Sequence, residues 1–515
     1  MTDPWVILVG LLVAGAVGLV SWRRSSLGRA ARLDHAPVLA RRAAARAALE
    51  RIARRCLDGS AWYQRVASRE LEALLAPGLD DETFFVRWRA VPALEKEQLI
   101  AGLDEIATDP RVSQSAIAAF DAAHPAGDGV FHGVYTVKKT SGTSGRMVFT
   151  VDTLAMQRRV AGLLLLRALL RVLWRRGAFS LLVPVARQIR VLVDRLRGQR
   201  RRWGRSSLLI FVHRGNRSVY QGATGRSLPL FARLLLAVDI VSHEEPLPSV
   251  LARAQQLDPE LIYGLPSRVA WLARAQERGE LRLAPVAVYV GGETLDGDLR
   301  DLFRRAWPGA AVINTYGTTE TKAIAIACAE CGELHLLEDI VHLELLDARG
   351  GEAASGEPAA RVLATSLLNH TVPVLRYQLT DRVVPLEDAG CRVRTRRVRV
   401  EGREPAFLWL RDPRDDRWLP LDGRVLREKL LTGGSVGFMV RQPEPSRLEI
   451  DVVLEAGEDA GRARDEARRC VHETLGEHGW SHVPIEVEVA VHDPESWNRV
   501  GGKLGSITSA VKPPA

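Results

Sequence analysis

Lysine is scarce in this sequence of 515 residues, in which only seven of the 71 basic residues are lysines and the rest are arginines. An arginine excess of this size is partly accounted for by coding bias, so the formal net charge of +9 does not by itself indicate an acidic partner. The sequence also lacks the motifs of nucleic-acid recognition, and we expect no nucleic-acid partner.

Cysteine is scarce as well. The five cysteines, an odd number in so long a chain, argue against a disulfide framework and favour a reducing compartment. The overall composition is globular, with 46% hydrophobic and 26% charged residues. At about 100 to 200 residues per domain, the length predicts two or three folded units.

Charge is absent from the eighteen residues Trp5 to Trp22, WVILVGLLVAGAVGLVSW. A helix of this length is just long enough to cross a bilayer core of about 30 Å, and a Trp lies at each end. A secretory signal peptide normally begins with basic residues, whereas here Arg23 and Arg24 follow the apolar run. The pattern therefore predicts a retained single-pass transmembrane anchor over residues 1–24 in the inner (cytoplasmic) membrane, with the rest of the chain facing the cytoplasm. The alternative is a buried or cleaved hydrophobic N-terminus.

A basic stretch runs from Arg158 to Arg205, with fourteen arginines against one acid, Asp194. Apolar runs separate the arginines, as in a basic amphipathic helix that lies on an anionic membrane surface. A solvated helix face that packs on the core through its leucines explains the same pattern. The sequence does not separate these two interpretations.

Strand and helix patterns alternate from Pro259 to Glu320. A short strand is followed by a turn at Gly264 to Ser267, and Ser267 is the predicted cap of the next helix. Further strands are predicted in VAVYVGGE and AAVINTYGTTE, with a helix between them. This order predicts an α/β sheet whose ligands gather at the loops after the strand ends.

The C-terminal part has a different pattern. RLEIDVVLE and PIEVEVAV alternate as strands, and the residues between them have helical periodicity. We expect a small α+β unit over residues 402–515, which the stretch Gly402 to Asp422 joins to a large α/β unit over residues 25–401.

The six residues Thr140 to Gly145, TSGTSG, form a loop rich in hydroxyls and glycines. Small residues let backbone N–H groups converge on phosphate oxygens, and the hydroxyls add further donors. The loop lacks the Gly-Lys-Ser/Thr ending of a P-loop, and taken alone it favours a plain linker.

The order of the motifs along the chain changes this interpretation. SGTSG, VGGE, NTYGTTE, RYQLTD, EGR and RVGGKLG follow one another between Val91 and Leu504. In this order they resemble the adenylate-forming superfamily, and VPALEKEQL, IYGLPSRV and CGELHLLEDIVHLELLD resemble its phenylacetate-CoA ligase branch. The resemblance implies sheets flanked by helices in a large domain, and a small mobile C-terminal domain. It also implies ATP-dependent, AMP-forming activation of an aryl or acyl carboxylic acid to an acyl-adenylate, followed by transfer to CoA.

The resemblance further implies roles for individual residues. Glu320 would hold Mg²⁺, and Thr318 or its neighbour Thr319 would contact the α-phosphate. Lys503 would supply positive charge as the pentacoordinate state develops. Tyr316 would stack on adenine, and Asp381 would accept hydrogen bonds from the ribose. The other residues with an implied nucleotide-binding role are Thr140, Ser141, Gly142, Thr143, Ser144 and Gly145 at the β- and γ-phosphates, Gly291, Gly292 and Glu293 at the adenine, and Gly317 and Arg403.

Two positions depart from the family pattern. Arg146 and Met147 follow the loop where relatives carry lysine and proline, so a phosphate-facing lysine is missing unless Arg146 replaces it. At the expected hinge, Gly402 and Arg403 are followed by EPA instead of an acidic pair. The altered hinge keeps three alternatives to CoA transfer open: an acyl carrier protein as acceptor, an amine or hydroxyl acceptor, and a non-catalytic membrane scaffold that retained the fold.

Three cysteines and a histidine form one further pattern. Cys328, Cys331 and His335 are spaced as C-x2-C-x3-H, and Cys391 follows later. Four such ligands match a structural Zn²⁺ site, although ordinary buried thiols explain the pattern equally well.

Overall fold

The computed structural model describes residues 26–124, 129–139, 148–176, 206–212, 236–242, 245, 247–293, 295, 297–328, 330–403, 407–423, 426, 429–430, 435–454, 458–493, 496–497 and 506–511. The predicted anchor Trp5 to Trp22, the loop Thr140 to Gly145 and Lys503 lie outside these residues. Within them, no helix is long and apolar enough to cross a membrane.

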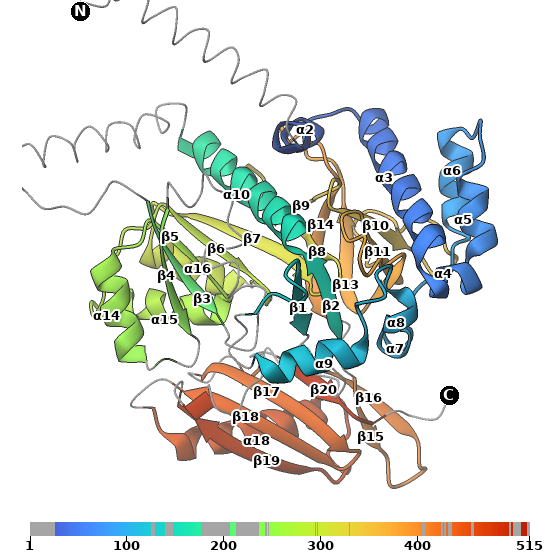
Figure 1. The fold of residues 1–515 in the computed structure, drawn as a ribbon. Coiled ribbons are helices and arrows are strands. Elements are labelled where there is room, and N and C mark those ends of the chain that lie inside the picture. Colours follow the sequence, from blue (N-terminus) through green and yellow to red (C-terminus); the bar gives the residue numbers. More distant parts are fainter. Residues whose placement is uncertain are drawn as a thin grey trace, which may run out of the picture.

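A group of helices begins the described chain and packs on one side of the molecule (Figure 1). Side chains start several of these helices: Asp80 accepts a hydrogen bond from the Thr83 N–H, and Ser113 accepts one from the Ala116 N–H. The helices are α2 (Ser26–Leu33), α3 (Val38–Gly59), α4 (Ala61–Val66), α5 (Ser68–Leu74), α6 (Asp81–Trp88), α7 (Lys96–Ala101), α8 (Leu103–Ile106) and α9 (Gln114–Ala123).

The central feature is a nine-stranded mixed sheet in the order β13-β14-β9-β8-β7-β6-β5-β3-β4. Strands β4, β3, β5, β6 and β7 are parallel neighbours, whereas β7, β8, β9, β14 and β13 are antiparallel neighbours. The parallel half matches the predicted α/β alternation. The strands are β3 (Ser206–Val212), β4 (Leu236–Ser242), β5 (Leu261–Gly264), β6 (Ala287–Gly291), β7 (Ala311–Thr318), β8 (Lys322–Ala327), β9 (Leu334–Leu336), β13 (Asp381–Leu386) and β14 (Arg397–Arg403).

Helices cover both faces of this sheet. Val288 and Val290 of β6 belong to one core cluster with α14 (Leu247–Leu257), α15 (Pro266–Glu277) and α16 (Gly297–Ala306). Ala287 and Tyr289, which alternate with them and so face the other way, pack in a different cluster with Leu163 of α10 (Leu154–Arg176). The sheet is therefore buried on both sides, as expected of parallel strands.

Two sequence predictions for these helices differ from the structure. Leu265, and not Ser267, occupies the N-cap of α15, and no side chain caps that helix in the predicted way. In the basic stretch, Arg167 of α10 is buried between the carboxylates of Asp34 and Asp339, at 2.8 Å from each. This arginine therefore faces neither water nor lipid, because it docks α2 and α10 together; residues 177–205 of the stretch lie outside the described residues.

Smaller sheets complete the large unit. The hairpin β1 (Tyr135–Lys139) and β2 (Phe149–Thr153) is antiparallel, with Lys139 opposite Phe149 at the end where the two strands are connected. The three-stranded sheet β10 (Val341–Leu346), β11 (Arg361–Ser366) and β12 (Tyr377–Leu379) shares a core with the hairpin and with α3 to α9.

The C-terminal strands form a separate sheet below the large unit in Figure 1. Its order is β19-β18-β17-β20, with α18 packed on it, which confirms the predicted strand, helix and strand. The predicted domain boundary at residue 402 lies within β14. The elements are β15 (Phe407–Arg411), β16 (Trp418–Asp422), β17 (Ser435–Glu444), β18 (Arg447–Leu454), α18 (Ala460–Glu477), β19 (Glu486–His492) and β20 (Ser506–Ser509).

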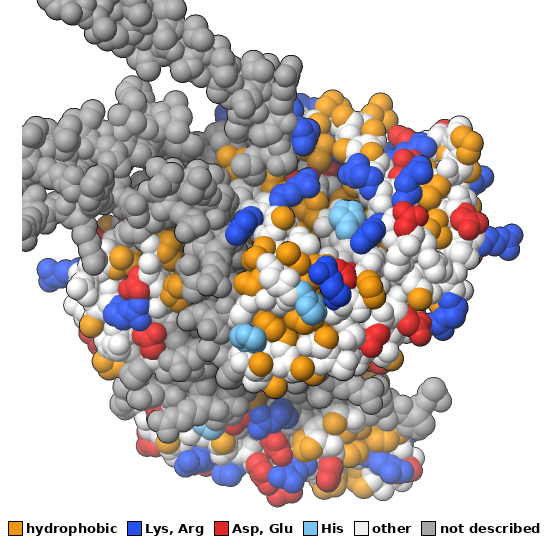
Figure 2. Space-filling model, viewed as in Figure 1, with side chains coloured by type: hydrophobic (Ala, Val, Ile, Leu, Met, Phe, Trp, Pro, Cys, Tyr) orange, Lys and Arg blue, Asp and Glu red, His pale blue; other side chains and the backbone are white. Residues whose placement is uncertain are grey.

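Charged side chains of both signs are interspersed over the described part of the surface shown in Figure 2. Two large hydrophobic side chains at the start of α3 stand out, since Val38 is 64% exposed and Leu39 is 76% exposed.

Candidate active site

A tight turn joins β7 to β8 at the point where the parallel half of the sheet meets the antiparallel half. A Cβ on Gly317 would lie 2.4 Å from the carbonyl oxygen of Lys322, so only glycine fits there. Lys322 itself has a φ of +71°, a conformation that a non-glycine residue rarely adopts. A strained turn of this kind is typical of functional sites.

The turn carries two of the predicted catalytic residues. The Thr318 hydroxyl accepts a hydrogen bond from the Thr321 N–H at 3.1 Å, which closes the turn locally. Glu320 is 8% exposed, and the Tyr377 hydroxyl donates to its Oε1 at 3.1 Å. The Glu320 carboxylate is therefore fixed in place by a residue that lies 57 positions later in the chain.

A second contact joins this turn to β13. The Tyr316 hydroxyl donates to Oδ2 of Asp381 at 2.9 Å. Asp381 is the first residue of β13 and lies opposite Arg403 in the ladder with β14. The structure thus brings together Tyr316, Thr318, Glu320 and Asp381, which the motif order alone had grouped.

The predicted glycine pair lies at the end of the neighbouring strand. Gly291 pairs with Thr315 of β7, and a Cβ on it would lie 2.3 Å from the Thr315 hydroxyl oxygen. Gly292 has a φ of +84°. Glu293 accepts a hydrogen bond from the Ser267 N–H at 3.1 Å, so its carboxylate holds the first turn of α15, where the sequence predicted a Ser267 cap. The adenine-binding role of these residues stays a prediction.

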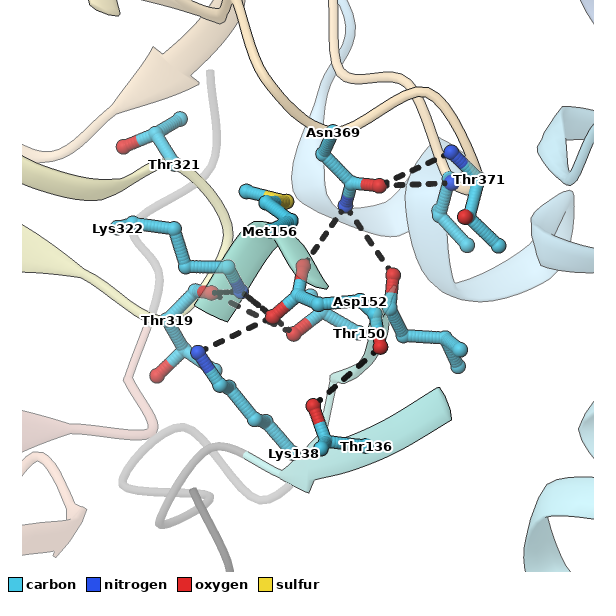
Figure 3. A network of polar contacts seen from close by, with 12 residues as sticks. Thr136, Lys138, Thr150, Asp152, Met156, Thr319, Thr321, Lys322, Asn369 and Thr371 are labelled. Carbon is cyan, nitrogen blue, oxygen red and sulfur yellow. Dashed lines mark hydrogen bonds and ion pairs between the residues drawn. The ribbon is translucent and has the colours of Figure 1, made fainter. Parts of the chain in front are cut away.

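Sequence reasoning missed a buried charge cluster beside the turn (Figure 3). Oδ2 of Asp152, on β2, lies 3.1 Å from Nζ of Lys138 on β1 and 2.8 Å from Nζ of Lys322 on β8. Nζ of Lys322 also donates to the Thr319 carbonyl at 2.6 Å. Asn369 donates to Oδ1 of Asp152 at 3.1 Å. The scarcity of lysine was the available signal, because two of the seven lysines meet here.

Burial and neighbouring charges shift the pKa values of Asp152 and Lys322 in this cluster. Burial alone would raise the pKa of Asp152, but attraction from Lys138 and Lys322 outweighs it, so the pKa is lowered. For Lys322, burial is the largest influence and lowers the pKa, with Asp152 opposing it and Lys138 adding to it. The cluster holds the hairpin β1–β2 firmly against the β7–β8 turn.

The three cysteines and the histidine of the sequence pattern also meet. One ligand atom from each of Cys328, Cys331, His335 and Cys391 lies within 4.8 Å of the others. Nδ1 of His335 lies 3.1 Å from the Thr395 carbonyl, which directs Nε2 toward Cys331 Sγ at 3.5 Å. This arrangement suits a metal ligand whose second nitrogen is oriented by the backbone.

The thiols of this cluster have shifted pKa values. Burial would raise the pKa of Cys331, but hydrogen bonds from the Glu333 N–H and from neighbouring side chains lower it. Burial and the Cys331 thiol raise the pKa of Cys391 to about 12. The donor set and its spacing fit a tetrahedral Zn²⁺ with sulfur and nitrogen ligands.

Comparisons with known proteins bear on the fold. No protein-family model matches the chain, and no curated protein matches it. Among solved structures, 2-hydroxyisobutyryl-CoA ligase in the postadenylation state, in complex with R3-HIB-AMP, is similar with a TM-score of 0.56 and 16% identity over 90% of this chain and 88% of that chain. The same ligase in complex with 2-HIB-AMP and CoA in the thioesterification state gives a TM-score of 0.50 and 16% identity over 93% and 92%.

This similarity shows that the chain has the fold seen in 2-hydroxyisobutyryl-CoA ligase, with a large mixed sheet and a small C-terminal sheet. The fold class expected from the sequence is confirmed at that level. At 16% identity the likeness concerns the fold alone, so the residue roles remain predictions.

Proposed function

We propose that this protein is an AMP-forming, adenylate-forming ligase that activates a carboxylic acid, aryl or acyl, with ATP. One observation carries the proposal: the β7–β8 turn and the strand before it carry Glu320, held by Tyr377, and Tyr316, held by Asp381, in a fold similar to that of 2-hydroxyisobutyryl-CoA ligase in complex with R3-HIB-AMP. The site lies where the strands of the parallel half end, as ligand sites in α/β sheets usually do.

The first step joins the substrate to AMP. A carboxylate oxygen attacks the α-phosphorus of ATP, a P–O bond forms, and pyrophosphate leaves with the electron pair of the broken bond. Glu320 would hold Mg²⁺, which neutralises phosphate charge. Thr318 and the loop Thr140 to Gly145 would donate hydrogen bonds to phosphate oxygens, and Lys503 would stabilise the charge of the transition state.

The second step passes the acyl group to an acceptor. We propose CoA as the acceptor, as in phenylacetate-CoA ligases, with an acyl carrier protein, an amine or a hydroxyl as the alternatives. The thiol attacks the acyl carbon and AMP leaves with the carboxylate oxygen that formed the mixed anhydride. A non-catalytic scaffold is the contrasting proposal.

Carboxylate-dependent exchange of pyrophosphate into ATP tests the first step. A panel of aryl and fatty acids is offered to the wild-type protein and to Lys503→Ala, and we expect exchange with at least one acid in the wild type only. Exchange that lacks any dependence on added carboxylate, or that persists in the variant, would contradict the assignment. Addition of CoA after exchange then separates thioester formation from transfer to another acceptor.

We also propose that the cysteine and histidine cluster binds one structural Zn²⁺. The cluster joins β9 and the connection before it to the loop before β14. The Arg394 N–H of that loop donates to the carbonyl of Asp34, the residue after α2, at 2.7 Å. A metal there would hold together two segments that are distant in the sequence.

Finally, we propose that residues 1–24 anchor the protein in the cytoplasmic membrane with the ligase fold in the cytoplasm. The eighteen uncharged residues end at Trp22, and only three residues separate Trp22 from the start of α2 at Ser26. The exposed Val38 and Leu39 at the start of α3 therefore lie close in the sequence to the proposed membrane surface, which is consistent with apolar contact at the lipid interface.

A further inference from the structure

The buried cluster of Lys138, Asp152 and Lys322 contains two lysine side chains and one carboxylate. Its members are almost fully enclosed, with side-chain exposures of 13% for Lys138, 0% for Asp152 and 6% for Lys322. Asn369 satisfies the other oxygen of Asp152, and no further acid forms an ion pair with either lysine among the described residues. One carboxylate therefore serves two lysines.

A buried lysine is costly to keep charged unless an anion compensates it. A ligand anion that reached the cluster would be attracted strongly, since the enclosed setting screens charges less than water does. Lys138 is the more exposed of the two lysines, so it is the one that a ligand can reach.

The position of the cluster indicates which ligand this is. Lys138 lies two residues before the loop Thr140 to Gly145, on the strand that leads into it, and Asp152 lies on the strand that returns from it. Lys322 lies two residues after Glu320 and donates to the carbonyl of Thr319 in the same turn. The cluster thus joins the two segments proposed to hold ATP.

We propose that Lys138, held in place by Asp152 and Lys322, supplies the positive charge that binds the terminal phosphates of ATP in this protein. The inference rests on the proposed function and deepens it. It also fits the sequence after the loop, where Arg146 and Met147 follow Gly145 and no lysine stands. The charge comes from the strand before the loop instead of from the residue after it.

The two lysines have different parts in this arrangement. Lys138 contacts phosphate. Lys322 is a positioning residue: it draws Asp152 toward the β7–β8 turn, at 2.8 Å, and shares its negative charge, so that Lys138 at 3.1 Å is not fully neutralised. Lys322 has a left-handed backbone conformation, and its Nζ donates a hydrogen bond to the Thr319 carbonyl in the same turn.

Equilibrium binding of MgATP and of AMP to the full-length protein tests the contact. For Lys138→Gln we expect the Kd of MgATP to rise about 10- to 100-fold, the size expected for loss of one charge-assisted contact, while the Kd of AMP stays within about twofold. Lys138→Arg should recover most of the affinity because it restores the charge. Lys429→Gln is the matched control, since it removes a lysine from an ion pair with Glu477 in the C-terminal unit.

Selectivity for the terminal phosphates separates this role from a merely structural one. Equal weakening of MgATP and AMP by Lys138→Gln, or no weakening of either, would overturn the inference. If Lys138→Gln does not fold, the affinity of Lys138→Arg and the steady-state kinetics of Lys322→Met test the inference instead. We expect Lys322→Met to raise the KM for MgATP more than it lowers kcat. An effect on kcat alone would contradict the positioning role.

A wild-type protein that neither binds MgATP nor exchanges pyrophosphate would overturn the proposed function, and the inference with it. Exchange that survives unchanged in both lysine variants would overturn only the inference.

Discussion

At the scale of single residues, Gly317 is a position where the backbone leaves no room for a side chain. A Cβ there would lie 2.4 Å from the Lys322 carbonyl oxygen and 3.0 Å from the Ala323 Cα, both backbone atoms. We expect Gly317→Ala to destabilise the protein by about 1–3 kcal/mol, because the turn must move to relieve the overlap. The same movement displaces Thr318 and Glu320, so pyrophosphate exchange should fall at least tenfold.

The control for this substitution is Gly297→Ala at the start of α16, where no atom lies within 4 Å of the added Cβ. Chemical denaturation and exchange are measured on both variants. If the two variants have the same stability and the same exchange activity, the close contact at Gly317 is not required for folding or for activity.

The sequence motifs identify some residues of the candidate site but not the residues to which they hydrogen-bond. Tyr316, Glu320 and Asp381 could be predicted because each belongs to a short motif in a known order. Tyr377 as the partner of Glu320 could not, since the hydrogen bond depends on how β12 packs against the turn. The scarcity of lysine draws attention to Lys322, but its pairing with Asp152 could not be predicted, because the two residues are 170 positions apart and neither lies in a motif.

At the scale of elements, the cysteine and histidine cluster connects pieces of the sheet that no short motif joins. We expect the purified protein to contain about one Zn²⁺ per chain, and Cys331→Ala to lose most of it. Loss of the metal should lower the Tm by at least about 5 °C, since binding to the folded state alone contributes directly to stability. Metal analysis and thermal unfolding check both statements.

The matched control is Cys470→Ala, which removes a buried thiol from α18, away from the cluster. It should keep its zinc. A wild-type protein without bound zinc, or a Cys331→Ala variant that keeps a full equivalent, would exclude the site.

The grouping of Cys328, Cys331 and His335 was predictable because all three lie within a short stretch of the sequence. Cys391 was named as a fourth candidate from the sequence, and the pairing of β14 with β9 explains why it lies near the other three, since it brings the loop before β14 to the β8–β9 connection. The capping prediction for Ser267 was wrong for a related reason: a side chain from the end of another strand, Glu293, took the place of the local hydroxyl. Long-range partners override local signals in both cases.

At the scale of the whole molecule, the two units and their order could be predicted from periodicity, because strands and helices alternate in the large unit and a strand, a helix and a strand follow in the small one. The helices α2 to α9 and the antiparallel half of the sheet were not predicted, since their faces are defined by packing against segments far along the chain. The resemblance of the motifs to adenylate-forming enzymes agrees with the fold seen in 2-hydroxyisobutyryl-CoA ligase.

Membrane sedimentation of the whole chain tests the proposed anchor over residues 1–24. The full chain should sediment with membranes and resist extraction by salt and carbonate, whereas a chain that begins at Ser25 should be released. Replacement of Val38 and Leu39 by serine in the shortened chain should remove any residual binding to anionic vesicles. Full membrane retention of the shortened chain, with or without those replacements, would refute the single-anchor account.

Transfer of oxygen is the most direct test of acyl-adenylate formation, the central claim. The acid found by exchange is supplied with oxygen-18 in its carboxylate, together with ATP and the acceptor, and the products are examined by mass spectrometry. Attack on the α-phosphorus predicts one labelled oxygen in AMP and none in pyrophosphate. Label in orthophosphate, or AMP without label, would contradict the account.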